Sequence, residues 1–177
     1  RMHPDVCGPV SEGVYEGRLT DADACSRQQL RLSAGADAAL RPSGVYWVPV
    51  SHTHCRQRSE PEARRIAELY HSLLHQSWVN RDGTTARLTS QDILIVAPYN
   101  AQVRLLRDTL GAGARVGTVD KFQGQEAAVA IYSMTTSDAR GARPRVGSSA
   151  TSAAGGSARA GASASICCSP PESSPAT

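Results

Sequence analysis

The sequence predicts an α/β fold in which a parallel β-sheet is flanked by helices, and three features carry this prediction. Residues 92–97 contain a continuous apolar run after Asp92, which is typical of a strand buried on both faces of a parallel sheet. Apolar side chains at helical spacing follow over residues 101–110. Two further apolar, β-branched runs lie at residues 115–119 and 127–134. Strand, helix and strand in this order form a right-handed βαβ unit by default.

An earlier strand is predicted at residues 44–50, which are β-branched and aromatic. Pro49 indicates that this strand lies at an edge of the sheet or close to its own end. Trp47 is a candidate platform for stacking a nucleic-acid base. A position in the hydrophobic core is the favoured interpretation of the same side chain.

One long helix is predicted between this strand and the βαβ unit. Ser59 and Glu62 form a capping box, and apolar residues at helical spacing then continue to about residue 76. Residues 20–42 lack clear periodicity, and we expect a loop with a short helix. Residues 80–90 contain an Asp-Gly pair and are expected to form a loop or a hairpin turn.

Composition limits the class of protein. The 177 residues suffice for one ordinary domain, and no apolar run is long enough to span a membrane. The net charge of +3 is too small to argue nucleic-acid binding by itself. Only Lys121 among the 19 basic side chains is a lysine, and with abundant Ala and Gly this indicates a GC-rich, bacterial genome. Because the chain starts at Arg1 without a signal peptide, we expect a cytoplasmic protein and a piece of something longer.

The cysteines and histidines suggest reduced thiols rather than a metal site. Neither a CxxC pair nor a metalloprotease pattern occurs, so surface histidines are the favoured interpretation over zinc. The five cysteines are Cys7, Cys25, Cys55, Cys167 and Cys168. The side chains considered as zinc ligands are His52, His54 and Cys55, with His71 and His75.

A polar insert, residues 120–126, separates the last two apolar runs. Gly124 lets the backbone take a positive φ or approach a ligand closely. Polar groups at the end of a parallel strand line the crevice of an α/β sheet, although an ordinary β-turn fits the spacing equally well. The donors and acceptors around the glycine are Thr118, Asp120, Lys121, Gln123, Gln125 and Glu126.

Several segments resemble motifs of one family, the superfamily 1 helicases. Thr-Val-Asp-Lys-Phe-Gln-Gly-Gln-Glu at residues 118–126 resembles motif V. Arg-Met-His-Pro at residues 1–4 resembles the Tyr-Arg-Met-His-Pro box, and Ala-Pro-Tyr-Asn-Ala-Gln at residues 97–102 resembles the motif IV region. In the family the box is followed by a helix and then by a turn that residues 14–19 fit. Pro9 disfavours that helix here.

The resemblance implies that residues 1–145 are part of the second RecA-like domain of an ATP-dependent, 5′-to-3′ DNA/RNA helicase with AAA-type P-loop relatives. In this family ATP lies between two RecA-like domains. The implied partners are therefore the first RecA-like domain of the same protein and a single strand of DNA or RNA, and no membrane. ATP and Mg²⁺ would be bound mainly by that first domain.

The resemblance also assigns roles at the nucleotide. Arg1 would reach the γ-phosphate, as a planar and always charged fork can. Gly124 would offer its backbone near the same phosphate. Glu126 would bond the ribose or an ordering water, and Gln123 and Glu126 join Arg1 as candidate catalytic residues.

A second group of residues would contact the nucleic acid. Contacts to the phosphate backbone position a strand without distinguishing its bases, so little sequence specificity is expected. Gln102 would face the cleft or the nucleic acid as well, and Tyr99 is otherwise a half-buried loop aromatic. The residues implied as nucleic-acid contacts are Pro98, Tyr99, Asn100, Thr118, Val119 and Lys121.

Other motifs of the family are absent from the 177 residues. The chain has neither a GxxxxGK[ST] loop, nor an acidic Walker B pair, nor motif VI, so we expect the chain alone to be inactive. Residues 146–177 are rich in Ser, Ala and Gly, which predicts disorder, and we expect either a shifted reading frame or a natural linker. A non-catalytic nucleic-acid-binding module and a degraded gene remnant remain alternative hypotheses.

Overall fold

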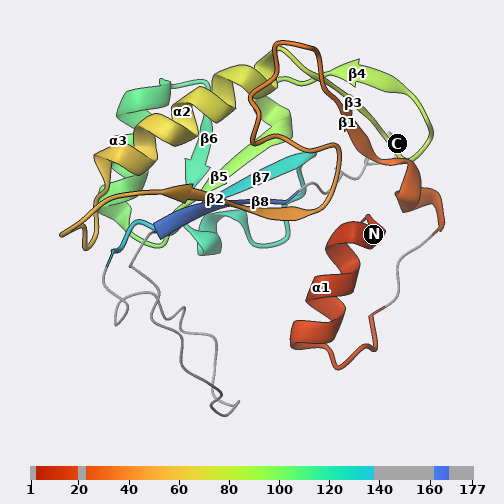
Figure 1. Cartoon of the computed structure of the whole chain (residues 1–177), viewed down its shortest axis with the longest axis horizontal. Helices are drawn as coiled ribbons and strands as arrows, with labels where there is room; N and C mark the ends of the chain where they lie inside the picture. The colour runs from red at the N-terminus through yellow and green to blue at the C-terminus, as the bar shows by residue number, and fades with distance from the viewer. Residues whose placement is uncertain (1–2, 20–22, 138–161, 168–177) are drawn as a thin grey trace, which may run out of the picture.

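The computed structural model describes residues 3–19, 23–137 and 162–167 and confirms a mixed α/β fold with a parallel sheet. A five-stranded sheet carries two helices side by side over one of its faces, α2 and α3 (Figure 1). The helices are α1 (Pro4–Val14), α2 (Glu60–Leu74) and α3 (Asn100–Leu110), and the 3₁₀ turns are η1 (Asp23–Arg27), η2 (Ser90–Asp92) and η3 (Val119–Phe122). The strands are β1 (Gln29–Arg31), β2 (Val45–Val50), β3 (Ser77–Val79), β4 (Thr85–Arg87), β5 (Ile93–Val96), β6 (Arg115–Gly117), β7 (Val129–Ser133) and β8 (Ala162–Cys167).

The direction of the strands determines which loops share an edge. The order in the large sheet is β2-β8-β7-β5-β6, and β5 pairs in parallel with both β6 and β7. Strand β8 is antiparallel to β7 and to β2, so β2 runs in the same direction as β5, β6 and β7. The carboxyl ends of these four strands therefore lie at one edge of the sheet.

The apolar run of β5 is buried on both faces, as the sequence predicts. Ile93 and Ile95 are fully buried in the main core with Leu106 of α3. Leu94 points to the other face, where it packs with Phe122 and other apolar side chains. Fully burying an aliphatic side chain contributes about 1.5–3 kcal/mol, so alternate residues of β5 stabilise both layers.

The predicted N-cap of α2 is confirmed, and α3 ends at Leu110, where its predicted helical spacing ends. Ser59 is the N-cap of α2, and its side chain accepts from the backbone N–H of Glu62. The capping box is only half formed, because the backbone N–H of Ser59 donates to Gln102 and not to Glu62. The C-cap of α3 is Gly111, which has a φ of 83°. Glycine adopts this positive φ at little energetic cost.

Helix α1 forms although Pro9 disfavours it. Pro4 opens the helix with its φ already set, and the side chain of His3 caps the first turn by accepting from the N–H of Asp5. Ser11 exchanges two hydrogen bonds with the backbone of Leu19, of 2.9 and 3.0 Å. These contacts offset the hydrogen bond that a proline inside the helix removes.

The favoured interpretation of Trp47 as a core aromatic is wrong, because this residue is 55% exposed. Along β2, Val48 and Val50 face the core under α2, so Trp47 belongs to the opposite face of the strand. The position of β2 at an edge of the five-stranded sheet agrees with the indication from Pro49.

Short elements complete the described chain. The expected hairpin is present, with Gly83 between β3 and β4 at a φ of 84°, and η1 is the expected short helix. Strand β1 pairs with β3 and lies in a region that predicts only a loop and a short helix. None of the helices in the described part of the chain is long and apolar enough to cross a membrane.

The segment from residue 146 onward predicts disorder, but six of its residues form β8 between β2 and β7. For these six the prediction is wrong. Composition hides a pattern of period two, Ala-Ser-Ala-Ser-Ile-Cys, and backbone pairing on both sides satisfies the N–H and C=O groups of the strand. The rest of residues 146–177 lies outside the described residues, so the hypotheses of a frameshift and of a linker stay predictions.

Candidate nucleic-acid interface

The motif IV-like and motif V-like turns lie next to each other at the carboxyl edge of the sheet. Strands β5 and β6 are parallel neighbours, and the N–H of Ala97 after β5 donates to the carbonyl of Gly117 at the end of β6, at 3.0 Å. The turns that begin at Pro98 and Thr118 therefore leave the sheet side by side. The structure brings together the two groups of residues that the resemblance implies as nucleic-acid contacts.

The turn after β5 presents both polar and apolar groups to solvent. Pro98 and Asn100 are exposed, and Tyr99 is half-buried at the N-cap position of α3. No side chain caps the first turn of α3 through a hydrogen bond, and no acidic side chain occupies this turn. The first N–H groups of a helix point outward along its axis, where they favour an anion such as a phosphate.

The turn after β6 is a 3₁₀ turn and not a plain β-turn. Thr118 is its N-cap and is half-buried, and Val119 is 56% exposed. The exposed Lys121 holds its Nζ 5.6 Å from the centroid of the Phe122 ring. The Phe122 ring packs in the smaller apolar cluster, so Lys121 makes a cation–π contact with a ring whose position is fixed.

Close packing under this turn requires a glycine. A Cβ on Gly117 would lie 2.7 Å from Cδ of Lys121 and 2.9 Å from Cε2 of Phe122. Real Cβ atoms do not make contacts this short, so the turn approaches the backbone of β6 only because residue 117 has no side chain.

The second half of the insert turns away from this edge. Gly124 adopts a φ of 76°, as expected, and the side chain of Gln125 accepts from Arg115 at 2.7 Å. Arg115 is the first residue of β6, whereas Thr118 follows its last. The candidate nucleotide-binding residues after η3 thus lie apart from the turn at Pro98, with Gln123 exposed and Glu126 half-buried. Arg1 lies outside the described residues.

Gln102 does not face a cleft, and that part of the expectation is wrong. Its side chain is fully buried. Its amide oxygen accepts from the N–H of Ser59 at 2.8 Å, and its amide nitrogen donates to the carbonyl of Ser59 and to Oγ of Ser133, both at 3.2 Å. Gln102 therefore fixes α3, and with it the preceding turn, to the start of α2 and the end of β7.

Glu62 plays a part at this edge that the sequence does not reveal. Its carboxylate is fully buried and accepts from the N–H groups of Met134 and Thr135, both at 2.7 Å. Burial raises the pKa of this carboxyl, while the two backbone donors act in the opposite direction. Thr135 has a φ of 69°, a strained value for a β-branched residue, so Glu62 holds a strained turn after β7.

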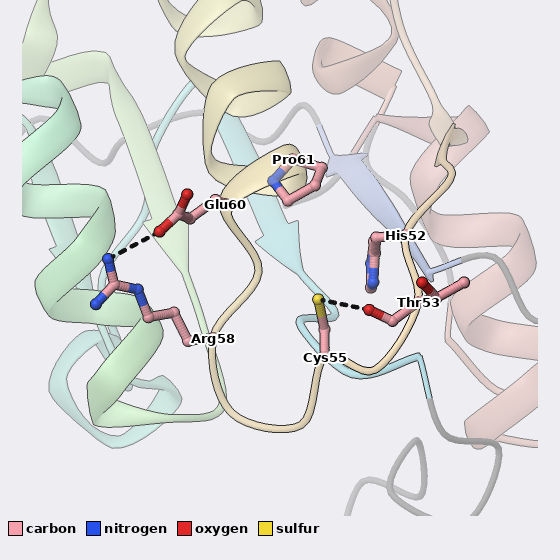
Figure 2. A pocket seen from close by; sticks show the side chains of 6 residues that line it. All are labelled: His52, Thr53, Cys55, Arg58, Glu60 and Pro61. Atoms are coloured by element: carbon pink, nitrogen blue, oxygen red, sulfur yellow. Dashed lines mark hydrogen bonds and ion pairs between the residues drawn. The ribbon is translucent and has the colours of Figure 1, made fainter.

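His52 lies beside this carboxylate, with Nε2 4.0 Å from Oε2 of Glu62. Its ring is buried, and desolvation lowers the pKa of the imidazole. An open pocket of about 480 Å³ lies here, at the end of β2 (Figure 2). The pocket is lined by His52, Thr53, Cys55, Arg58, Glu60 and Pro61.

In the part of the chain that the structure describes, no cluster of potential metal ligands supports the hypothesis of a metal site. No group of three or more His, Cys, Asp or Glu side chains that could hold a metal ion occurs there. Cys7, Cys25 and Cys55 are free cysteines, which agrees with the expectation of reduced thiols for these three.

Comparison with known proteins matches residues 1–153 to the model of a family described as "AAA domain". Over 149 residues the chain is 26% identical to the DNA polymerase alpha-associated DNA helicase A of Schizosaccharomyces pombe, which covers 78% of this chain and 22% of that protein. Over 153 residues it is 26% identical to the DNA-binding protein SMUBP-2 of Rattus norvegicus, covering 80% of this chain and 15% of that protein. The same figures hold for SMUBP-2 of Mesocricetus auratus.

The chain thus spans about a fifth or less of the length of these relatives. All three are eukaryotic, and they give no support to the expected bacterial origin. The family match covers most of the chain and includes the motif IV-like and motif V-like turns. The chain therefore belongs to this AAA domain family, and its resemblance to the superfamily 1 helicases is confirmed.

Proposed function

We propose that this chain is part of the second RecA-like domain of an ATP-dependent helicase that moves 5′ to 3′ along a single strand. The observation that carries the proposal is the hydrogen bond from Ala97 to Gly117, which holds the motif IV-like and motif V-like turns together at one edge. Ligands of open α/β sheets bind outside the carboxyl ends of the strands, which is where these turns lie.

The chemistry of the edge suits a nucleic-acid backbone. Lys121 supplies a positive charge, the first turn of α3 supplies backbone N–H donors, and Val119 and Pro98 supply exposed apolar surface. Phosphate contacts of this kind bind tightly without distinguishing bases. Single-stranded DNA or RNA of any sequence is therefore the proposed partner.

The nucleotide would lie against the other side of the motif V-like segment. Gly124 has open space around the position of its absent Cβ, which leaves its backbone accessible to a phosphate. Gln123, Glu126 and Arg1 are the proposed contributions to a site that the first RecA-like domain would complete with ATP and Mg²⁺. Phosphoryl transfer depends mainly on positioning and on charge stabilisation, which arginine and backbone donors provide.

We expect the 177-residue chain alone to bind a single strand without hydrolysing ATP, because its sequence has no GxxxxGK[ST] loop to hold the phosphates. Phosphate release is measured with the purified chain in the presence and absence of oligo(dT). Turnover stimulated by the oligonucleotide would contradict this part of the proposal.

Binding is tested by the fluorescence anisotropy of a labelled 12-nucleotide oligo(dT) at several salt concentrations. For single strands, each phosphate contact contributes about −0.7 to the slope of log K against log salt. We expect Lys121→Gln to weaken binding and to reduce this slope by about 0.7. Arg87→Gln, which removes one exposed charge from β4, is the matched control and should leave the slope unchanged.

The response of binding to ATP analogues distinguishes a motor domain from a non-catalytic binding module. Binding that responds to ATP analogues once the first domain is supplied would support the motor domain. Binding with no such response would favour a non-catalytic binding module. If Lys121→Gln and Arg87→Gln behave alike, the proposed edge is not the contact surface.

A further inference from the structure

The pocket at the end of β2 lies on the same edge as the proposed nucleic-acid contacts. Strand β2 is parallel to β5, β6 and β7, so its carboxyl end opens in the same direction as theirs. The backbone of Cys55 exchanges hydrogen bonds with Ser137 beyond β7, at 2.9 and 3.0 Å. The loop that forms the pocket is therefore tied to the segment that follows β7, across the intervening strand β8.

The order of the strands places these features in a row. From β6 to β2, a nucleic-acid strand that crosses this edge would pass Thr118, then Tyr99, the end of β7, the start of β8 and finally the pocket. Neighbouring strands lie about 4.8 Å apart, so the row extends over roughly 19 Å. A single strand that lies on the two turns therefore has the pocket in its path.

His52 provides an independent sign of a ligand. Its side chain is 1% exposed, and neither Nδ1 nor Nε2 has a hydrogen-bond partner. In the described part of the chain, Gln28 is the other residue whose buried side-chain polar atoms lack a hydrogen-bond partner. Buried polar groups in native proteins almost always have a hydrogen-bond partner, and Oε2 of Glu62, 4.0 Å from Nε2, is too distant to be one. A buried imidazole that lines a pocket without a hydrogen bond therefore indicates a group that enters the pocket.

The side chains around the pocket favour an anion with several acceptor oxygens. Figure 2 shows the nitrogen-bearing end of the His52 ring pointing toward Thr53 and Cys55. A neutral imidazole offers one N–H, Thr53 offers a hydroxyl and Arg58 offers its guanidinium. Arg58 is paired with Glu60 at 3.2 Å, but both are more than half exposed, so this pair is weak and exchangeable.

The acidic side chains near the pocket are already engaged. Glu60 is within 3.7 Å of Arg64 as well as pairing with Arg58. Both oxygens of Glu62 accept backbone N–H groups of the turn after β7. An entering phosphate therefore meets donors from His52 and Thr53 and a charge from Arg58.

We propose that the pocket lined by His52, Thr53 and Arg58 receives a phosphate of the single strand that contacts the turns after β5 and β6. The proposal rests on the proposed function and extends its contact surface by one site. The subsite positions the strand and carries no base specificity.

The test uses the whole chain, a labelled 12-nucleotide oligo(dT) and the double variant Thr53→Val/Arg58→Gln. Both positions are exposed, so the variant is expected to fold, and circular dichroism checks this. We expect the affinity for oligo(dT) to fall roughly tenfold and the salt slope to fall by about 0.7. Arg87→Gln serves as the control with one charge removed, and His52→Gln is a second variant that keeps a polar group of similar reach.

Each outcome separates this proposal from the function on which it rests. If the chain binds oligo(dT) and the double variant binds as tightly as Arg87→Gln, the subsite is refuted while the proposed function stands. If the chain binds no single strand, both are refuted. Nuclear magnetic resonance of the ring nitrogens gives a direct readout, since the His52 signals should shift when oligo(dT) is added, and unchanged signals under saturating oligo(dT) would also refute the subsite.

Discussion

At the scale of single residues, two buried polar side chains organise the carboxyl edge. Glu62 and Gln102 lie within the core, and each serves backbone groups from other segments. Neither role follows from the sequence, because their hydrogen-bond partners lie between 31 and 73 residues away along the chain. The positive φ of Gly124 could be predicted, since it depends only on glycine within a polar turn.

The first prediction concerns the carboxylate of Glu62. Glu62→Gln replaces one of two acceptor oxygens with an NH₂ group that faces a backbone N–H. We expect the variant to lose about 1–3 kcal/mol of unfolding free energy, the cost of leaving a buried donor unsatisfied. Urea denaturation measures the change. Glu60→Gln, two residues earlier and exposed, is the control and should stay within about 0.5 kcal/mol of the parent. Equal losses in the two variants would show that burial of the carboxylate is not the cause.

The second prediction concerns Gly117. Gly117→Ala forces its Cβ against Lys121 and the Phe122 ring, so the turn after β6 must shift. We expect a loss of about 1–3 kcal/mol in stability, as in overpacked cores, together with weaker binding of oligo(dT). Gly113→Ala is the control, because nothing lies within 4 Å of its Cβ position. If both variants bind like the parent, the close approach at Gly117 does not position the contact residues.

At the scale of elements, the sequence predicts the secondary structure of those segments whose pattern of apolar residues reflects which of their faces are buried. Strand β5 shows a continuous apolar run because both of its faces are covered, and α2 shows a clear helical period because only one of its faces is covered. Helix α1 is implied by the family resemblance although Pro9 disfavours it, and the hydrogen bonds between Ser11 and Leu19 are among the contacts that stabilise it. Strand β8 defeats the prediction because its backbone pairs with β2 and β7, which composition does not reveal.

The third prediction concerns the ion pair that ties the connection before β2 to α2. Arg65 donates two hydrogen bonds to the carboxylate of Asp37, of 2.6 and 2.7 Å, and holds the pKa of Asp37 below its ordinary value. At a pH between the pKa of Asp37 in the folded chain and its ordinary pKa in the unfolded chain, the unfolded chain binds more protons than the folded chain. The stability that the pair contributes is therefore present above the ordinary pKa of aspartate. It is lost as the pH falls through the lower pKa that Asp37 has in the folded chain.

We expect Asp37→Asn to cost about 1 kcal/mol at neutral pH and progressively less as the pH falls below about 4. A series of urea denaturation curves across this range measures the difference from the parent. Asp82→Asn, in the exposed turn between β3 and β4, should show almost no difference at any pH. A gap for Asp37→Asn that stays constant through the acid range would contradict the assignment to the Arg65 pair.

At the scale of the whole molecule, the arrangement of parallel strands turns separate motifs into one surface. The motif IV-like and motif V-like turns are about twenty residues apart in sequence, and the pairing of β5 with β6 brings them together. That adjacency could be predicted, because a βαβ unit places successive carboxyl ends at one edge. The pocket at His52 could not, because its position depends on β2 and on contacts with the segment after β7.

The most direct test of the central claim is hydrogen exchange of the whole chain, measured by mass spectrometry with and without saturating oligo(dT). We expect slower exchange in peptides that cover residues 97–101 and 117–122, because the bound strand shields both turns at once. Peptides that cover β3 and β4 should exchange unchanged. Protection of the β3–β4 hairpin, or of only one of the two turns, would contradict a single contact surface at the carboxyl edge.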